Sequence, residues 1–128
     1  MIPTRHYVLV CGSHTTVDVE TVQEMISTLH LLYGDALRVL HGDAKCVDRV
    51  AGAHAERLGV PTKKFPADWD AHGKAAGPIR NRAMADYLDW CRGFGHTVQV
   101  LAFRGGSGTE DMVKVAEERG IPVDRIDA

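Results

Sequence analysis

The segment that decides the fold class is His6-Tyr7-Val8-Leu9-Val10-Cys11-Gly12-Ser13. The run from Tyr7 to Cys11 lacks the polar alternation of a half-exposed strand, so it predicts a strand that is buried on both faces. Gly12 and Ser13 end the run, and apolar residues at helical spacing follow them. Strands of this kind occur in parallel sheets that helices cover on both sides. The segment therefore predicts an α/β fold.

The rest of the chain continues the alternation of strand and helix. Apolar residues at helical spacing predict helices between Asp18 and Gly34, from Val47 to Leu58, from Pro78 to about Trp90, and after Thr109. Short apolar runs predict further strands at residues 36–41, 62–65, 96–103 and 123–126. With right-handed crossovers, this order predicts a Rossmann-like domain of three layers, with a parallel sheet of about five strands between two layers of helices.

The middle of the chain is less regular. Residues 66–77 have no clean period and are rich in small residues, so they are predicted to form a loop, and long loops in compact domains often carry function. Pro78 is well placed to open the helix that follows. One face of that helix is predicted to contain Ile79, Ala83, Met84 and Tyr87.

The composition limits the class of protein. The chain has 128 residues, 45% of them hydrophobic and 25% charged, which predicts one globular domain over residues 1–128. No segment has the apolar length of a membrane span, and the N-terminus is typical of a strand rather than a signal peptide. We therefore expect a soluble, cytoplasmic protein without a membrane partner.

The spacing of cysteines and histidines disfavours a metal site, and the net charge disfavours binding of polymeric nucleic acid. The three cysteines are far apart and lack C-x-x-C spacing, so reduced thiols are expected. The seven histidines show no ligand spacing such as H-E-x-x-H, so no metal site is predicted. A net charge of −2 gives no global field to hold a nucleic acid backbone.

Glycine-rich segments follow four of the predicted strands. They are Gly12-Ser13, Gly42-Asp43, the stretch from Trp69 to Gly77, and Gly105-Gly106-Ser107-Gly108-Thr109. In an open parallel sheet, ligands bind beyond the carboxyl ends of the strands. All four segments are therefore predicted to meet at one edge of the sheet and to form a ligand site there.

The segment from Gly105 to Thr109 predicts a phosphate-binding loop. Glycines let backbone N–H groups approach an anion, and the N-terminus of the following helix supplies positive potential. Thr109 could add a hydroxyl donor. The alternative is that the glycines only permit a tight turn between strand and helix. We favour phosphate, because three glycines in four positions exceed what a turn requires.

The common nucleotide motifs are missing. Neither G-x-G-x-x-G after the first strand nor G-x-x-x-x-G-K-[ST] occurs, which disfavours an ordinary NAD or ATP site, and no cofactor is predicted. Arg80 could bind phosphate or carboxylate in bidentate fashion, and Asn81 could contact a base or sugar. Alternatively, both belong to a solvated first turn. Asp48 could cap a helix or accept a ribose hydroxyl. Trp69 could stack on a base or pack under its loop.

Taken together, the loops match a known pattern. The matching segments are Cys11-Gly12-Ser13, His41-Gly42-Asp43-Ala44 with Asp48, Phe65 to Trp69, Gly73 to Pro78 with Arg80-Asn81, and Gly105 to Thr109. They resemble the YspA-like branch of the SLOG superfamily, known chiefly from bacterial and phage proteins. The superfamily includes the Lonely Guy phosphoribohydrolases and the DNA-processing protein DprA. The resemblance implies a nucleotide-like ligand and a homodimer formed through helices beside the site.

The resemblance and the residue chemistry together define the predicted site. Its ligand-binding residues are Gly12, Ser13, His14, Gly42, Asp43, Asp48, Trp69, Lys74, Gly77, Arg80, Asn81, Gly105, Gly106, Ser107, Gly108 and Thr109. The chain also departs from the pattern, since His14 stands where the branch usually has arginine and Cys46 where it usually has glycine. The phosphoribohydrolases carry P-G-G-x-G-T-x-x-E, whereas Arg104 replaces the proline here and Met112 falls at the glutamate position.

Two functions follow from this site. The first is a sensor or sequestering domain that binds a nucleotide or nucleotide derivative. The second is a nucleotide N-glycosidase, in which Asp111 is the candidate catalytic carboxylate and Arg80 the phosphate anchor. A thioether at Met112 cannot replace a carboxylate, which favours binding. Single-stranded DNA binding is a minor alternative, because an aromatic content of 6% with net negative charge gives it little support.

Overall fold

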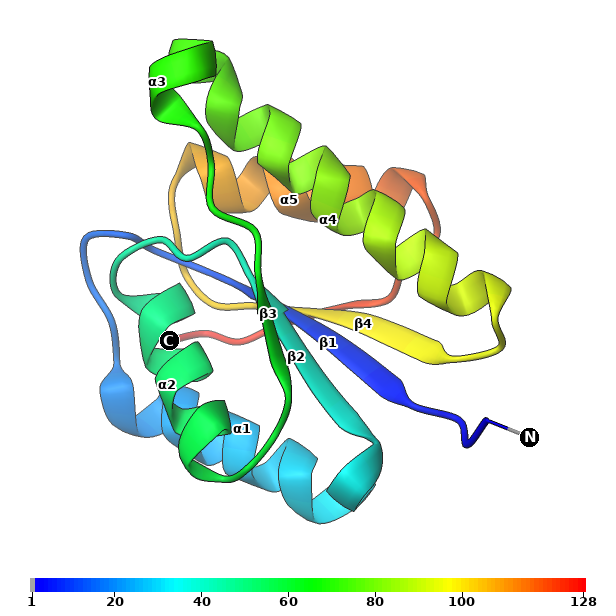
Figure 1. Cartoon of the computed structure of the whole chain (residues 1–128). Coiled ribbons are helices and arrows are strands. Elements are labelled where there is room, and N and C mark those ends of the chain that lie inside the picture. The colour runs from blue at the N-terminus through cyan, green and yellow to red at the C-terminus, as the bar shows by residue number, and fades with distance from the viewer. Residues whose placement is uncertain (1) are drawn as a thin grey trace.

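The structure is a computed structural model that describes residues 2–128. Its centre is a five-stranded parallel sheet in the order β3-β2-β1-β4-β5 (Figure 1). The strands are β1 (His6–Cys11), β2 (Leu37–His41), β3 (Thr62–Lys64), β4 (Thr97–Ala102) and β5 (Val123–Arg125). The order reverses between β1 and β4, which is the switch point of a doubly wound sheet. The predicted Rossmann-like α/β fold is confirmed.

Helices cover both faces of the sheet. They are α1 (Val19–Tyr33), α2 (Val47–Arg57), α3 (Trp69–His72), α4 (Ala76–Gly93) and α5 (Ser107–Glu118), with 3-10 turns η1 (Gly34–Ala36) and η2 (Gly73–Ala75). The pair α1 and α2 lies on one face, and α4 and α5 lie on the other (Figure 1). Val8 and Val10 of β1 pack in the core between the sheet and the pair α1 and α2, and Leu9 packs in the core between the sheet and the pair α4 and α5. This strand is buried on both faces, as its sequence predicts.

The ends of α1 show how local sequence sets an element. The carboxylate of Asp18 accepts a hydrogen bond from the backbone N–H of Thr21 at 3.1 Å and so caps the helix. Gly34 ends it with φ of 54°, in the left-handed region that glycine occupies at little cost. Both boundaries agree with the sequence prediction.

The prediction of an unbroken loop over residues 66–77 is wrong. Asp68 caps the short helix α3 by accepting from the N–H of Ala71 at 3.0 Å. The η2 turn follows, and α4 begins at Ala76, ahead of Pro78. A helix of four residues is too short to show a period in the sequence. Pro78 lies within the first turn of α4, where its missing N–H costs nothing.

The buried face of α4 also differs from the prediction. Met84 is buried, but Ile79 is 46% exposed and Ala83 is exposed as well. The buried face instead includes Asn81, a polar residue that an apolar pattern cannot locate. The exposed apolar residues therefore form a stripe that no other part of residues 2–128 covers. None of the helices in residues 2–128 is long and apolar enough to cross a membrane.

Candidate functional site

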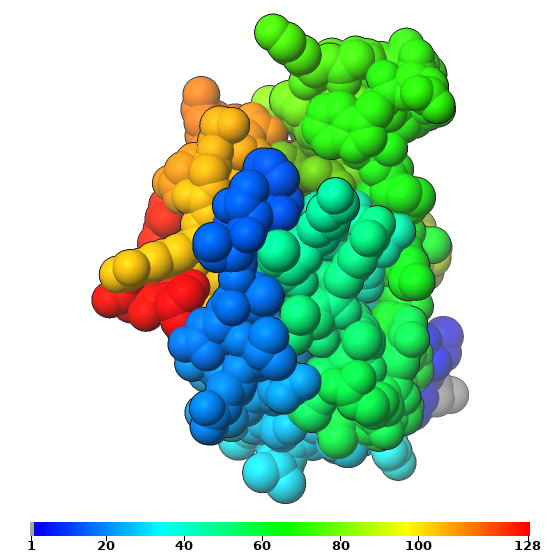
Figure 2. Space-filling view, turned by 90° about the vertical axis from the view of Figure 1, so that its left-hand side faces the viewer, coloured from blue at the N-terminus to red at the C-terminus, as the bar shows by residue number. Residues whose placement is uncertain are grey.

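A cavity of about 600 Å³ opens at the carboxyl edge of the sheet, beside the switch point between β1 and β4. Figure 2 shows the hollow beneath the overhanging α3 segment (green), above the loop that follows β1 (blue). The cavity wall includes Asp111 and every predicted ligand-binding residue except Ser13, Gly42, Asp43 and Gly105. It also includes four residues that were not predicted, namely Cys11, Ala44, Pro78 and Met84.

The N-terminus of α5 faces the cavity with its glycines open. Gly106 and Gly108 both line the cavity, and a Cβ added to either would meet no atom within 4 Å. Gly106 is the N-cap residue and offers no side-chain cap, so the first N–H groups of α5 have no partner within the helix. This is the arrangement that favours an anion at a helix N-terminus.

Gly105 has a different role from the other two glycines. A Cβ at Gly105 would collide with Oγ1 of the buried Thr109 and would lie 3.0 Å from the carbonyl carbon of Gly12. Gly105 is therefore glycine because two loops and a buried side chain pack against it. The glycines of this segment therefore differ, since packing requires Gly105 whereas Gly106 and Gly108 border open space in the cavity.

Arg80 forms hydrogen bonds within the protein through two of its three side-chain nitrogens. Its Nε donates to Oδ1 of Asn81 at 2.9 Å, and its Nη1 donates to the carbonyl of Gly42 at 2.7 Å. A Cβ on Gly42 would overlap the guanidinium, so Gly42 makes room for Arg80 rather than for a ligand. Within residues 2–128, Nη2 of Arg80 has no hydrogen-bond partner, and Arg80 lines the cavity.

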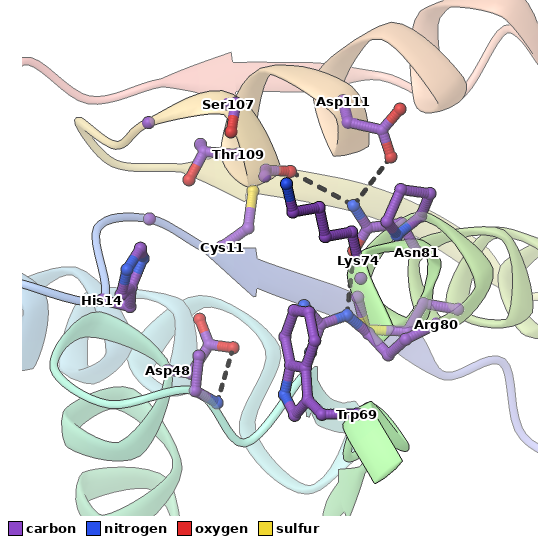
Figure 3. Close-up of a pocket in the computed structure, with 17 residues that line it drawn as sticks. Cys11, His14, Asp48, Trp69, Lys74, Arg80, Asn81, Ser107, Thr109 and Asp111 are labelled. Atoms are coloured by element: carbon purple, nitrogen blue, oxygen red, sulfur yellow. Dashed lines mark hydrogen bonds between the residues drawn. The ribbon is translucent and has the colours of Figure 1, made fainter. Parts of the chain in front are cut away.

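Asn81 joins α4 to α5. Its side chain, which is 3% exposed, donates from Nδ2 to the carbonyl of Gly108 at 3.1 Å and to Oδ2 of Asp111 at 3.0 Å. Arg82 approaches the same carboxylate oxygen at 3.4 Å. These contacts orient Asp111 beside the cavity and leave its Oδ1 without a partner in the described part of the chain (Figure 3).

Asp48 does not cap its helix. The N-cap residue of α2 is Cys46, and Asp48 lies one residue inside the helix with only 5% of its surface exposed. Its Oδ2 accepts from the N–H groups of Gly42 at 3.0 Å and Ala44 at 3.3 Å. Burial raises the pKa of Asp48 to about 6, while these N–H groups and Arg80 act in the opposite direction. A buried carboxylate therefore lines the cavity.

The turn that Asp48 holds has an unusual backbone. Asp43 and Cys46 have φ of 56° and 65°, in the left-handed region that costs non-glycine residues about 1 kcal/mol or more. The N–H of Asp43 also donates to Nδ1 of His41 at 3.0 Å. Sequence spacing alone could not reveal this turn, in which the side chain of Asp48 points inward to the N–H groups of Gly42 and Ala44.

Trp69 and Lys74 form the rim of the cavity (Figure 3). Trp69 is 59% exposed, and the edge of its ring would lie 3.4 Å from a Cβ on Gly77. One edge of Trp69 therefore packs on the start of α4, while most of the ring stays open. Lys74 is exposed and forms no ion pair among residues 2–128.

Cys11 and Met84 add apolar surface that the sequence did not predict for the site. Cys11 ends β1, and burial raises the pKa of its thiol far above the usual value, so the group stays protonated. Cys11 could have been predicted as a cavity residue from its position at the end of a central strand. Met84 could not, because its inward orientation depends on how the helix packs. Within residues 2–128, no group of three or more histidine, cysteine or acidic side chains could hold a metal ion.

Ser13 lies outside the cavity wall but joins the loops around it. Its N–H donates to the carbonyl of Arg104 at 2.8 Å, and its carbonyl accepts from the N–H of Val47 at 3.2 Å. Its hydroxyl accepts from the N–H groups of Thr15 and Thr16, both at 3.1 Å. Ser13 therefore positions the loops that follow β1 and β4, so that Gly12 and His14 reach the cavity.

The fold and the cavity place this chain among Rossmann-like proteins with a site at the sheet edge. The family model described as "YspA, cpYpsA-related SLOG family" matches residues 6–72. The chain is also 36% identical, over 126 residues, to "Gene 61 protein" of Mycobacterium phage D29, covering 91% of this chain and 92% of that protein. The chain belongs to the YspA, cpYpsA-related SLOG family, and the predicted membership is confirmed.

A solved structure shares the fold. The chain is similar to DNA processing protein A (DprA) from Streptococcus pneumoniae, with a TM-score of 0.55 and 18% sequence identity. The match covers 94% of this chain and 58% of the DprA chain, so this chain spans little more than half of that protein. At this identity the likeness supports the fold alone.

Proposed function

We propose that this protein binds a nucleotide or nucleotide-derived small molecule in the cavity at the switch point. The observation that carries the proposal is the N-terminus of α5, where Gly106 and Gly108 leave the first-turn N–H groups open to the cavity. A phosphate is the anion that such a terminus most often binds in Rossmann-like folds. Lys74 on the rim and the free Nη2 of Arg80 add positive charge.

The rest of the cavity supports a ligand with an aromatic base. A volume of about 600 Å³ lies within the range of small-molecule sites. The exposed ring of Trp69 offers a stacking surface, and Cys11 and Met84 provide apolar wall. Binding alone needs no catalytic group, so the protein would act as a sensor or as a domain that sequesters its ligand.

The proposal is tested with the purified protein and a panel of nucleoside monophosphates and cyclic nucleotides. Thermal shift follows binding, because a ligand that binds only the folded state raises the melting temperature. Chromatography of the same samples follows release of free base. We expect stabilisation by at least one nucleotide without base release. A panel that causes no shift and no release would contradict the nucleotide assignment.

The N-glycosidase remains a second candidate because of Asp111. Its Oδ2 is held by Asn81 and Arg82, its Oδ1 has no partner in residues 2–128, and the residue lines the cavity. An oriented carboxylate of this kind can stabilise an oxocarbenium-like transition state. Base release that disappears in Asp111→Ala would support the enzyme, and release that persists in this variant would exclude Asp111 as its carboxylate.

Single-stranded DNA binding stays a minor alternative. The charged residues of the cavity wall are two cations, Lys74 and Arg80, and two carboxylates, Asp48 and Asp111. A track for a polymer backbone needs an excess of cations along a groove. The balanced wall therefore favours a small ligand over a polymer.

Arg80→Ala is expected to weaken nucleotide binding by about 1.5 to 3 kcal/mol, the value of a charge-assisted hydrogen bond. Loss of its bond to Gly42 should also lower the free energy of unfolding by about 1 kcal/mol. Calorimetric titration measures the first effect and urea unfolding the second. Arg104→Ala is the matched control, because Arg104 is exposed, lies outside the cavity and loses the same charge. Equal affinities of both variants would remove Arg80 from the ligand site.

We also propose that the protein forms a homodimer through the exposed stripe of α4. Ile79, Ala83, Trp90 and Phe94 lie on one side of the helix, and Trp90 and Phe94 are 61% and 64% exposed. An antiparallel pairing about a two-fold axis would set the two rings of one copy against the smaller residues of the other. Light scattering should give a dimer mass for the wild type and a monomer mass for Trp90→Glu. A monomeric wild type at micromolar concentration would contradict the proposal.

A further inference from the structure

We propose that Asp48 accepts a hydrogen bond from a ribose hydroxyl, so that the cavity selects ribonucleotides over 2′-deoxyribonucleotides. This inference rests on the proposed function, since it names the sugar of the ligand for the same cavity. Three features carry it, which are the free oxygen of Asp48, the charge of this carboxylate and its place relative to the phosphate and base positions.

The first feature is that only one of the two carboxylate oxygens of Asp48 has hydrogen-bond partners in residues 2–128. Oδ2 is held by the N–H groups of Gly42 and Ala44. Oδ1 has no partner in residues 2–128, and Asp48 lines the cavity. An ionised carboxylate accepts hydrogen bonds and donates none, so its free oxygen can bind only a ligand group that donates a hydrogen bond. A sugar hydroxyl supplies such a donor without adding charge.

The second feature is that the turn does not need the negative charge. The side-chain carbonyl of an asparagine could accept the same two N–H groups. A carboxylate at a site that is 5% exposed costs free energy that a neutral amide would not. The hydrogen bonds of the turn therefore do not by themselves require a carboxylate at position 48.

The third feature is the position of Asp48 in the cavity. Figure 3 shows Asp48 across Cys11 from Ser107 at the start of α5, with Trp69 to one side. With the phosphate at α5 and the base on Trp69, the sugar lies between them and faces the wall that contains Asp48. An exocyclic amine of the base could instead donate to Asp48. Sugar phosphates that lack a base distinguish a donor on the ribose from a donor on the base.

The experiment compares ribose 5-phosphate with 2-deoxyribose 5-phosphate by calorimetric titration, and then each ribonucleoside 5′-monophosphate with its 2′-deoxy counterpart. For the wild type we expect the ribose form to bind at least about tenfold more tightly in each pair that binds. In Asp48→Asn the ratio should approach one, because an amide N–H₂ replaces the free acceptor. The affinity for the deoxy form should stay within about twofold.

Asp43→Asn is the matched control. Asp43 belongs to the same turn but lies outside the cavity wall, and asparagine tolerates its positive φ of 56°. This variant should keep the ribose preference of the wild type. Equal binding of the ribose and deoxyribose forms to the wild type would overturn the role of Asp48 and leave the phosphate site standing. Failure of every sugar phosphate and nucleotide to bind would overturn both.

Discussion

Gly106→Val is expected to abolish binding of phosphate-bearing ligands while the protein stays folded. Gly106 lines the cavity just ahead of the open N–H groups of α5, so a valine side chain would occupy the space that an anion needs. Its backbone angles, φ of −96° and ψ of −150°, are extended and suit valine. Loss of glycine at an N-cap position should cost about 1 kcal/mol or less. We expect a loss of at least about a hundredfold in calorimetric titration, because the charge-assisted bonds of several N–H groups disappear.

Gly105→Ala is the contrasting variant for this prediction. The added methyl group would collide with Oγ1 of Thr109 and press on the backbone of Gly12, so the cost falls on folding. Overpacking of this kind costs about 1 to 3 kcal/mol. Urea unfolding should therefore separate the two variants. A Gly106→Val protein with wild-type affinity would contradict the phosphate loop.

Asp48→Asn is expected to stabilise the ligand-free protein at neutral pH by about 2 to 3 kcal/mol. The pKa of Asp48 rises from an ordinary value of 3.8 to about 6 in the folded protein because the carboxylate is buried. Between these pKa values the folded state binds more protons than the unfolded state, so wild-type stability falls as pH rises through this window. Each pKa unit corresponds to about 1.4 kcal/mol. Asparagine does not titrate, so the variant avoids this loss.

Urea unfolding at pH 4, 5, 6 and 7.5 measures this effect. The difference between wild type and Asp48→Asn should grow from a small value at pH 4 to its full size above about pH 6.5. Asp43→Asn should stay close to the wild-type profile, because the charge of Asp43 raises the pKa of Asp48 much less than burial does. Parallel profiles for the wild type and Asp48→Asn would show that burial of Asp48 carries no cost. A variant that is more stable yet loses the ribose preference would show that function retains this carboxylate.

The elements of the fold were largely predictable from the sequence. The apolar run at Tyr7 to Cys11 predicts a strand buried on both faces because each side chain has to be covered. Asp18 and Gly34 mark the ends of α1 through local hydrogen bonding and backbone conformation. Such signals act over a few residues, so they do not depend on the rest of the fold. The α3 helix was not predicted, because four residues are too few to show a helical period of apolar residues.

The position of the cavity was also predictable, because the carboxyl ends of parallel strands meet at one edge whatever the side chains are. That rule brings Gly12, Asp48, Arg80 and Gly106 to one cavity. It does not predict which atoms face a ligand. Arg80, for example, donates two hydrogen bonds to Asn81, its neighbour in the sequence, and to Gly42, which is distant in the sequence.

The α/β class, the family, and the edge of the sheet at which the loops meet follow from the amino-acid sequence, because these depend on local pattern and on the geometry of parallel strands. The separate roles of Gly105 and Gly106, the inward turn of Asp48 and the exposed stripe of α4 emerge only in the folded protein. Each of these depends on contacts between segments that are distant in the chain, and no local pattern encodes such contacts.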